Sequence, residues 1–106
     1  MKTYLWRVNY TSSGSDGLLS EGGSGRRTAI DELVTGLGGG IEAWYYAFGD
    51  DDLYVIASLP GDVEAAAVSL RVAASGAARI HTTVLLTEQQ IDDAAKASVS
   101  YRSPGA

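Results

Sequence analysis

The sequence predicts one small α+β domain with the element order β-α-β-β-α-β and a four-stranded antiparallel sheet. Its 106 residues fit a single domain. Four segments are rich in aromatic and β-branched residues, as strands are, and their side chains can be assigned alternately to two faces. Two further segments, one after the first strand and one after the third, carry apolar residues at the spacing of a helical stripe. Only a short acidic turn separates the two middle strands, which predicts a hairpin.

In the first part of the chain, residues 3–10 predict a strand, and residues 11–17, rich in serine and glycine, predict a loop. A helix is expected over residues 24–37, with Ser24 as its N-cap. Three consecutive glycines at 38–40 should end this helix, because glycine tolerates the left-handed conformation at the position after a helix.

The rest of the chain follows the same logic. The expected elements are a strand over 41–48, a strand over 52–59, a helix over 63–75, a strand over 78–86 and a short C-terminal helix. Asp62 is a candidate N-cap for the second helix, and Thr87 with Gln90 resembles a capping box for the last one. The domain is therefore expected to span residues 1–97, and residues 98–106 to form a tail.

Two β-α-β units joined by a hairpin give the ferredoxin-like arrangement, in which both main helices cover one face of the sheet. The other face of a monomer should then be polar. The strands contradict this, because apolar residues such as Val55 and Ile56 fall on opposite faces of the third strand. A second copy of the sheet can cover the remaining face, so we expect a homodimer or a larger closed homo-oligomer of the dimeric α/β-barrel type.

Composition excludes several classes of protein. The chain has no cysteine, so disulfides, thiolate metal sites and cysteine nucleophiles are excluded. Its formal charge of −5 is opposite to that of a typical nucleic-acid binder. No apolar run approaches the ~18 residues that cross a bilayer, and no signal stretch follows the N-terminus. We therefore expect a cytoplasmic protein without nucleic-acid or membrane partners.

The chain resembles the GYD-domain family of small bacterial proteins over residues 2–96. The matching features, in chain order, are Asn9-Tyr10-Thr11, Arg26-Arg27, Leu37-Gly38-Gly39, Tyr45-Tyr46, Gly49, Asp52, Leu59-Pro60, Asp62, Gly76, Arg79 and Thr82-Thr83. One departure is that Asp51 stands where the family's Gly-Tyr-Asp signature has its tyrosine. The resemblance implies a ferredoxin-like fold similar to dimeric α/β-barrel proteins, and it implies no particular activity.

His81, the only histidine, is the candidate catalytic residue, with Arg79 beside it on the same strand. A histidine titrates near neutral pH and can act as a general base in a pocket between sheet and helices. The alternative is a hydrogen-bonded or surface histidine without a chemical role.

The segment from Glu21 to Arg27 is a candidate anion site. Its glycines free backbone N–H groups, a predicted helix start follows at Ser24, and Arg26 and Arg27 add positive charge. It lacks the lysine and the spacing of a P-loop. The alternative is a flexible loop with solvated arginines.

Aromatic residues of the strands form a third candidate site, a ligand pocket lined by Trp44 and Tyr46 together with Trp6 and Tyr45. The alternative is a core or an interface, where aromatic residues of strands are more often found. The three aspartates 50–52 can hold a hard cation, although aspartate also suits a turn without any ligand. We therefore predict no metal site.

Two hypotheses about function follow. In the first, the chain is a self-associating module that binds a small organic or anionic ligand. In the second, it is a cofactor-free enzyme of the oxygenase or isomerase type, acting on a small aromatic or polyketide-like substrate with His81 as base and Arg79 or Arg26 holding an anionic oxygen. No cofactor is expected under either hypothesis.

Overall fold

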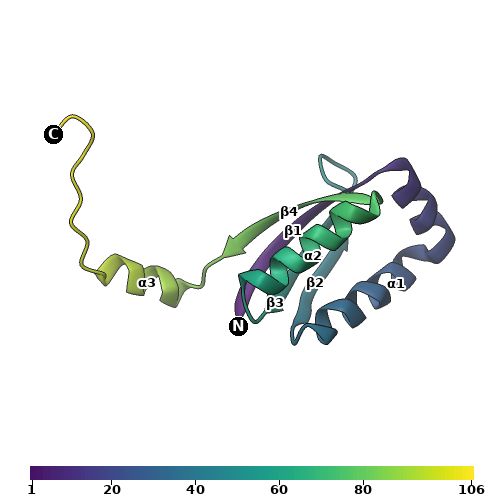
Figure 1. The fold of residues 1–106 in the computed structure, drawn as a ribbon, viewed down its shortest axis with the longest axis horizontal. Helices are drawn as coiled ribbons and strands as arrows, with labels where there is room; N and C mark the ends of the chain where they lie inside the picture. Colours follow the sequence, from purple (N-terminus) through teal and green to yellow (C-terminus); the bar gives the residue numbers. More distant parts are fainter.

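A computed structural model describes residues 1–106 and confirms the predicted fold class. The elements are β1 (Lys2–Tyr10), α1 (Ser12–Gly36), β2 (Gly40–Tyr46), β3 (Leu53–Leu59), α2 (Asp62–Ser75), β4 (Ala78–Leu85) and α3 (Glu88–Lys96). Figure 1 shows α1 and α2 on one side of the sheet, with α3 set apart from it at the end of β4. None of the helices combines the length and the apolar character needed to cross a membrane.

The four strands form one antiparallel sheet in the order β2-β3-β1-β4. The central pair is β1 and β3, in which Trp6 lies opposite Val55. Strand β4 pairs only with β1 and therefore forms an edge of the sheet. This order follows from the β-α-β-β-α-β connection, because each crossover helix skips one strand position.

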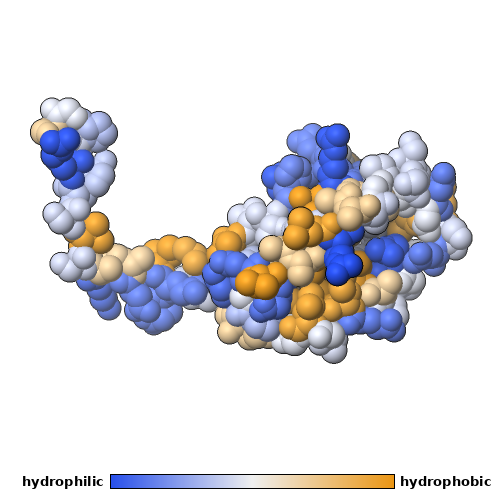
Figure 2. All heavy atoms as spheres, in the orientation of Figure 1, coloured by the Kyte–Doolittle hydropathy of each residue, from blue (hydrophilic) through white to orange (hydrophobic).

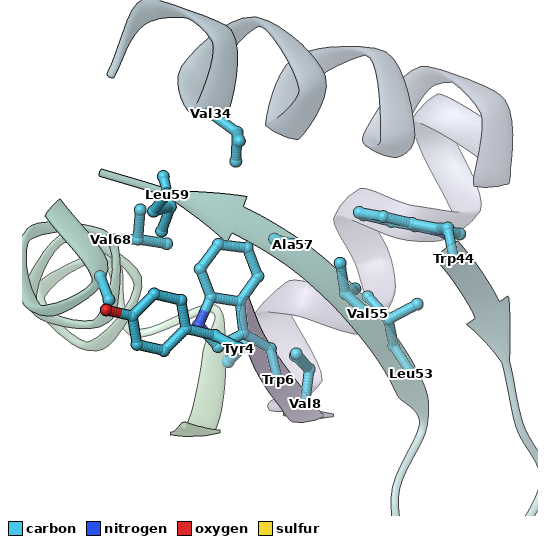
Figure 3. Packing of buried hydrophobic residues seen from close by; sticks show 12 residues of the cluster. Tyr4, Trp6, Val8, Val34, Trp44, Leu53, Val55, Ala57, Leu59 and Val68 are labelled. Carbon is cyan, nitrogen blue, oxygen red and sulfur yellow. The ribbon is translucent and has the colours of Figure 1, made fainter. Parts of the chain in front are cut away.

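The core lies between the helices and the sheet face that carries Tyr4, Trp6 and Val8 of β1. Every second residue of β3, from Leu53 to Leu59, is buried on that face, as expected for a strand covered on one side. Figure 3 shows these side chains packed beneath Val34 of α1 and beside Val68 of α2.

Helix α1 differs from the prediction. Residues 11–17 do not form a loop, and Ser24 is not the N-cap. The helix begins at Ser12, with Thr11 as its N-cap, whose hydroxyl accepts a hydrogen bond from the Gly14 N–H. A break in the helix falls at Gly22, whose φ of +76° is open to glycine and rarely to other residues. The prediction was wrong because the glycines and serines of this segment are poor helix formers.

The start of α1 is held by contacts with a distant part of the chain. The Thr11 backbone N–H donates to the Ala77 carbonyl (3.0 Å), and its hydroxyl donates to the Gly76 carbonyl (2.7 Å). A Cβ at Gly14 would lie 1.8 Å from the Ala77 carbonyl oxygen, so only glycine allows this close approach. These tertiary contacts stabilise a helix whose own residues have only a weak preference for helix.

A bulge in β2 corrects the predicted alternation of that strand. Simple alternation places Ile41 on the same face as Tyr45, but the register shifts between Ile41 and Ala43. As a result, Ile41 lies opposite Ala57 and packs against the core, on the same side as Trp44. Tyr45 lies on the other face and is 72% exposed.

For the other two helices, the predicted N-cap of α2 is wrong and that of α3 is right. Asp62 is not the N-cap of α2, because Gly61 holds that position. Its carboxylate instead accepts hydrogen bonds from the Tyr4 hydroxyl (2.6 Å) and the Lys2 ammonium (2.9 Å). The capping box of Thr87 and Gln90 is confirmed at the start of α3.

Candidate functional site

A cavity of about 50 Å³, which we call the inner cavity, lies between the sheet and the two main helices. It is larger than the ~10–15 Å³ that one water requires. Eleven of its 12 lining residues are hydrophobic, and Arg26 of α1 is the exception. The lining residues are Trp6, Val8, Tyr10, Arg26, Ile30, Trp44, Leu53, Val55, Val68, Val72, Ala78 and Ile80.

Two tryptophans on either side of Val55 give the inner cavity its aromatic walls. Trp6 of β1 and Trp44 of β2 both lie opposite Val55 of β3, and Figure 3 shows their rings flanking it. Both indole N–H groups are buried and have no hydrogen-bond partner within the protein. A buried donor without an acceptor costs about 1–3 kcal/mol. These two donors are therefore unusual for a closed core and favour an acceptor from outside the chain.

A second, more polar hollow of about 210 Å³, the entrance, adjoins the inner cavity. The two share Tyr10, Arg26, Val72 and Ala78 as wall residues. The entrance adds polar residues from both helices, namely Ser13, Glu21 and Ser75. Together the hollows offer an apolar inner part and a polar outer part with Arg26 between them.

Arg26 is only weakly held by the protein itself. Its Nη1 lies 3.9 Å from Glu21 Oε2, and both side chains are partly exposed, at 34% and 47%. Such a pair contributes little to stability, because water screens it and the long side chains lose freedom. The guanidinium can therefore turn to an anionic ligand.

Tyr10 supplies a hydroxyl that stays protonated at neutral pH. Burial, reinforced by the neighbouring Tyr46, raises the pKa of Tyr10 to about 12. Tyr10, Arg26 and the two indoles all offer hydrogen-bond donors, and no carboxylate lines the inner cavity. This arrangement suits a ligand that brings acceptors, such as a carbonyl or a carboxylate.

The break in α1 is fixed beside the site by β2. The Tyr46 hydroxyl donates a hydrogen bond to the Gly23 carbonyl (2.9 Å). The Tyr46 ring in turn packs edge-on against Trp44, with ring centroids 5.9 Å apart and an interplanar angle of 76°. Tyr46 thus supports the wall formed by Trp44 but does not line the inner cavity itself.

The structure brings only some of the predicted ligand residues together. Arg26 and Trp44 meet at the inner cavity, with Tyr46 behind them. Ser24 and Arg27 lie on the exposed side of α1, outside both hollows. The anion site expected over Glu21–Arg27 therefore reduces to the pair formed by Glu21 and Arg26.

His81 and Arg79 lie away from this site. Both are exposed on the edge strand β4, where they pair with Arg7 and Asn9 of β1. Neither lines the inner cavity or the entrance, and the His81 imidazole makes no hydrogen bond within the protein, although its backbone lies in the β1–β4 ladder. Their predicted roles as base and anion holder remain predictions that this geometry does not support.

The aspartates of the turn are used by the protein itself. Asp51 is only 4% exposed and accepts hydrogen bonds from Asn9 (2.8 Å), Tyr54 (3.2 Å) and Arg7 (3.3 Å). Burial favours a higher pKa for the Asp51 carboxyl, but these partners outweigh burial and lower the pKa below its ordinary value. Asp52 accepts from the Tyr10 backbone N–H (2.8 Å) and so fastens the hairpin to β1.

Sequence reasoning missed Tyr10 and Val72 as site residues. Alternation along β1 places Tyr10 on the same face as Trp6, and that signal could have identified it. Val72 lies on a helix that meets Tyr10 only in the folded chain, so no local pattern marks it.

The comparisons with known proteins agree with the fold. The GYD domain family model matches residues 4–95 of the chain. Neither a curated protein nor a solved structure matches it. Because the family match covers most of the chain, including every element from which the inner cavity is built, the protein belongs to the GYD domain family.

Proposed function

We propose that the protein is a self-associating module that binds a small organic acid in the inner cavity and its entrance. The observation that carries this proposal is the placement of Arg26, which lines both the apolar inner cavity and the polar entrance. An apolar ligand tail can fill the inner part while the ligand's carboxylate meets the guanidinium.

The size of the two hollows narrows the ligand. An apolar cavity of about 150 Å³ holds benzene, so the inner cavity of about 50 Å³ takes only a few carbon atoms. The entrance, at about 210 Å³, holds the remainder of the molecule. A short branched or straight-chain carboxylic acid fits this division better than a large aromatic compound.

Self-association is supported by the face of the sheet that no helix covers, which we call the open face. Leu5 of β1 and Ile56 of β3 lie opposite each other at its centre, half-buried, and Tyr45 of β2 is exposed beside them. Arg7 and Thr83 flank them on the same face. Apolar residues at the centre of an uncovered sheet face, with polar residues around them, are typical of a contact site on a soluble protein. A second open face supplies a matching partner in a two-fold dimer.

Intrinsic fluorescence tests ligand binding directly. The chain has two tryptophans, and both line the inner cavity, so its tryptophan emission reports on this site. We expect saturable changes on titration with carboxylates from butyrate to octanoate, and weaker changes with the matching primary amides, which lack the negative charge. Equal responses to acids and amides, or none, contradict the proposal.

Adjacent arginines provide a matched pair of variants. Arg26→Gln should weaken carboxylate binding at least about tenfold. This corresponds to the loss of a charge-assisted contact that contributes ~1.4 kcal/mol to the binding free energy. Arg27→Gln makes the same chemical change on the exposed side of α1 and should leave affinity within about twofold. Similar losses in the two variants would show a general effect of charge and not a contact with Arg26.

The open face is tested separately by sedimentation velocity at micromolar concentration. Ile56→Arg places a charge at the centre of this face and should shift the protein towards the monomer. An unmodified protein that sediments as an 11.1 kDa monomer at all concentrations contradicts self-association, whatever the fluorescence titration shows.

A further inference from the structure

Two charged side chains on the open face have no opposite charge beside them. Arg79 lies between Ala78 and Ile80, which line the inner cavity, and therefore points to the open face. Glu42 of β2 accepts a hydrogen bond from the Ser58 hydroxyl (2.6 Å). Because Ser58 lies between two buried residues of β3, it faces away from the core, and this contact places Glu42 on the open face. Both charges are exposed, and neither takes part in an ion pair of the protein.

The other charges on the strands of this face are neutralised within the protein. The Arg7 guanidinium lies 3.3 Å from the buried carboxylate of Asp51. That carboxylate also accepts hydrogen bonds from Asn9 (2.8 Å) and Tyr54 (3.2 Å). Arg79 and Glu42 are therefore the two charges of the open face that are free to meet a partner.

These two charges lie at opposite corners of the sheet. Strands β2 and β4 are its two edges, so three strand spacings, together about 14 Å, separate them. Through the registers of the sheet, Glu42 is level with the peptide between Tyr4 and Leu5 of β1, whereas Arg79 is level with Asn9. This difference corresponds to about 15 Å along the strands. The line that joins the charges is therefore about 21 Å long and runs at about 45° to the strands.

A second copy of the open face is complementary to this pattern of charge. Two sheets that face each other across a two-fold axis bring the same pair of sites together twice. An axis perpendicular to the diagonal places Arg79 of each copy over Glu42 of the other. Axes along or across the strands instead place both charges over the uncharged corners, where Tyr45 and Leu85 lie. Charge complementarity thus selects one arrangement of the two copies.

This axis also fixes how the two sheets cross. Because it lies at about 45° to the strands, the strands of the two copies cross at about 90°, one of the two angles at which packed sheets are found. The midpoint of the diagonal falls between the Leu5–Ile56 and Arg7–Tyr54 pairs of β1 and β3. The axis therefore passes through the centre of the open face, and the two charge contacts lie at its rim.

The chain's own C-terminal arm, residues 86–106, cannot meet both charges. Two residues separate β4 from α3 and span at most about 7 Å, so α3 begins beside the corner where β4 ends. Directed along β4, α3 carries Lys96 towards Arg79, and directed across the sheet it approaches Glu42 alone. Figures 1 and 2 show the arm extending away from the domain. Only a second sheet provides an opposite charge for both residues.

We propose that Arg79 of each copy pairs with Glu42 of the other, and that these two contacts set a near-perpendicular crossing of the sheets in the open-face dimer. The inference rests on the self-association proposed above and names the residues that orient it. Charged groups at the rim of an interface select one docking arrangement and disfavour others, while the apolar centre supplies much of the affinity.

Charge reversal tests this pairing, because each contact involves both copies. Glu42→Arg alone and Arg79→Glu alone each create two like-charge contacts and should weaken dimerisation about tenfold or more in sedimentation velocity. The double variant has opposite charges again and should dimerise within about threefold of the unmodified protein. In an equal mixture of the two single variants, the heterodimer should form in preference to either homodimer, since it alone has opposite charges at both contacts.

Native mass spectrometry of the mixture separates the three dimers, because the two substitutions change the mass in opposite directions. Glu32→Arg and Arg71→Glu make the same changes at exposed positions of α1 and α2, outside the open face, and their mixture should show no preference. A misfolded variant is not rescued by mixing, so a preferred heterodimer reports on the contact itself.

The outcomes separate this inference from the wider proposal. Statistical mixing of Glu42→Arg with Arg79→Glu chains, or a double variant as weak as the single ones, overturns the pairing. If Ile56→Arg still dissociates the dimer in that case, the open face remains the interface with a different crossing of the sheets. A dimer that resists Ile56→Arg, or a protein that never dimerises, overturns both.

Discussion

A single added methylene at Val72 distinguishes a true cavity from ordinary packing. Val72 lies on α2 and lines both the inner cavity and the entrance. Burying one more CH₂ is worth about 0.8 kcal/mol. Filling a cavity of about 50 Å³ recovers at most about 1.2 kcal/mol at the ~24 cal/mol per Å³ seen in protein cores. We therefore expect Val72→Ile to raise the free energy of unfolding by about 1 kcal/mol.

Urea unfolding followed by circular dichroism measures this change, and thermal unfolding should show a rise in Tm of about 4–8 °C. Val63→Ile makes the same change at a valine that is 80% exposed on the same helix, so it should stay within about 0.5 kcal/mol. Val72→Ile should also weaken carboxylate binding, because the new methyl group occupies the place of the ligand's tail. A fall in the free energy of unfolding of about 1–3 kcal/mol, the usual cost of overpacking, would show that Val72 faces ordinary packing and no cavity.

Three further substitutions test the frame around the site. Gly14→Ala should lower the free energy of unfolding by more than about 2 kcal/mol, because the Cβ would lie 1.8 Å from the Ala77 carbonyl oxygen. Gly17→Ala, with free space around it, should not destabilise the protein. Equal effects of the two substitutions in urea unfolding contradict this. Gly22→Ala should cost about 1–3 kcal/mol by the same measurement, because its φ of +76° and ψ of 166° suit glycine almost alone, and a neutral result would contradict the break. Asp51→Asn should flatten the loss of stability in acid. The pKa of Asp51 lies below its ordinary 3.8, so its contribution is present above that pH and disappears as pH falls through the folded-state pKa; urea titrations of both proteins at several pH values give the two slopes, and equal slopes count against the prediction.

Strand patterns predicted the sheet well because each strand obeys a local rule. Alternation along β3 marks its buried face without any knowledge of its neighbours, and the capping box of α3 is complete within four residues. The bulge in β2 broke that rule, since one extra residue moves Ile41 to the other face. Alternation alone cannot show where a register shifts.

Helix α1 and the site depend on contacts that no local pattern records. Its first half begins where Thr11 meets the carbonyls of Gly76 and Ala77, which lie far along the chain. Sequence reasoning identified Arg26 and Trp44 from charge and aromatic character, but it could not separate Arg26 from Arg27. Their difference arises from the direction of α1 after Gly22, because only Arg26 then turns towards the sheet.

Residues 11–23, the first half of α1, border the entrance. They are attached to the domain at their two ends and only weakly in between. Thr11 is tied to the carbonyls of Gly76 and Ala77, and Gly23 is tied to Tyr46, while Gly14 is the one buried residue between them. A segment with so few apolar contacts opens at a lower free energy than the core, in a local fluctuation that leaves the sheet intact. If the proposed organic acid binds there, it can therefore be exchanged without global unfolding, and its residence time should be set by the two backbone anchors and not by the tryptophans of the inner cavity.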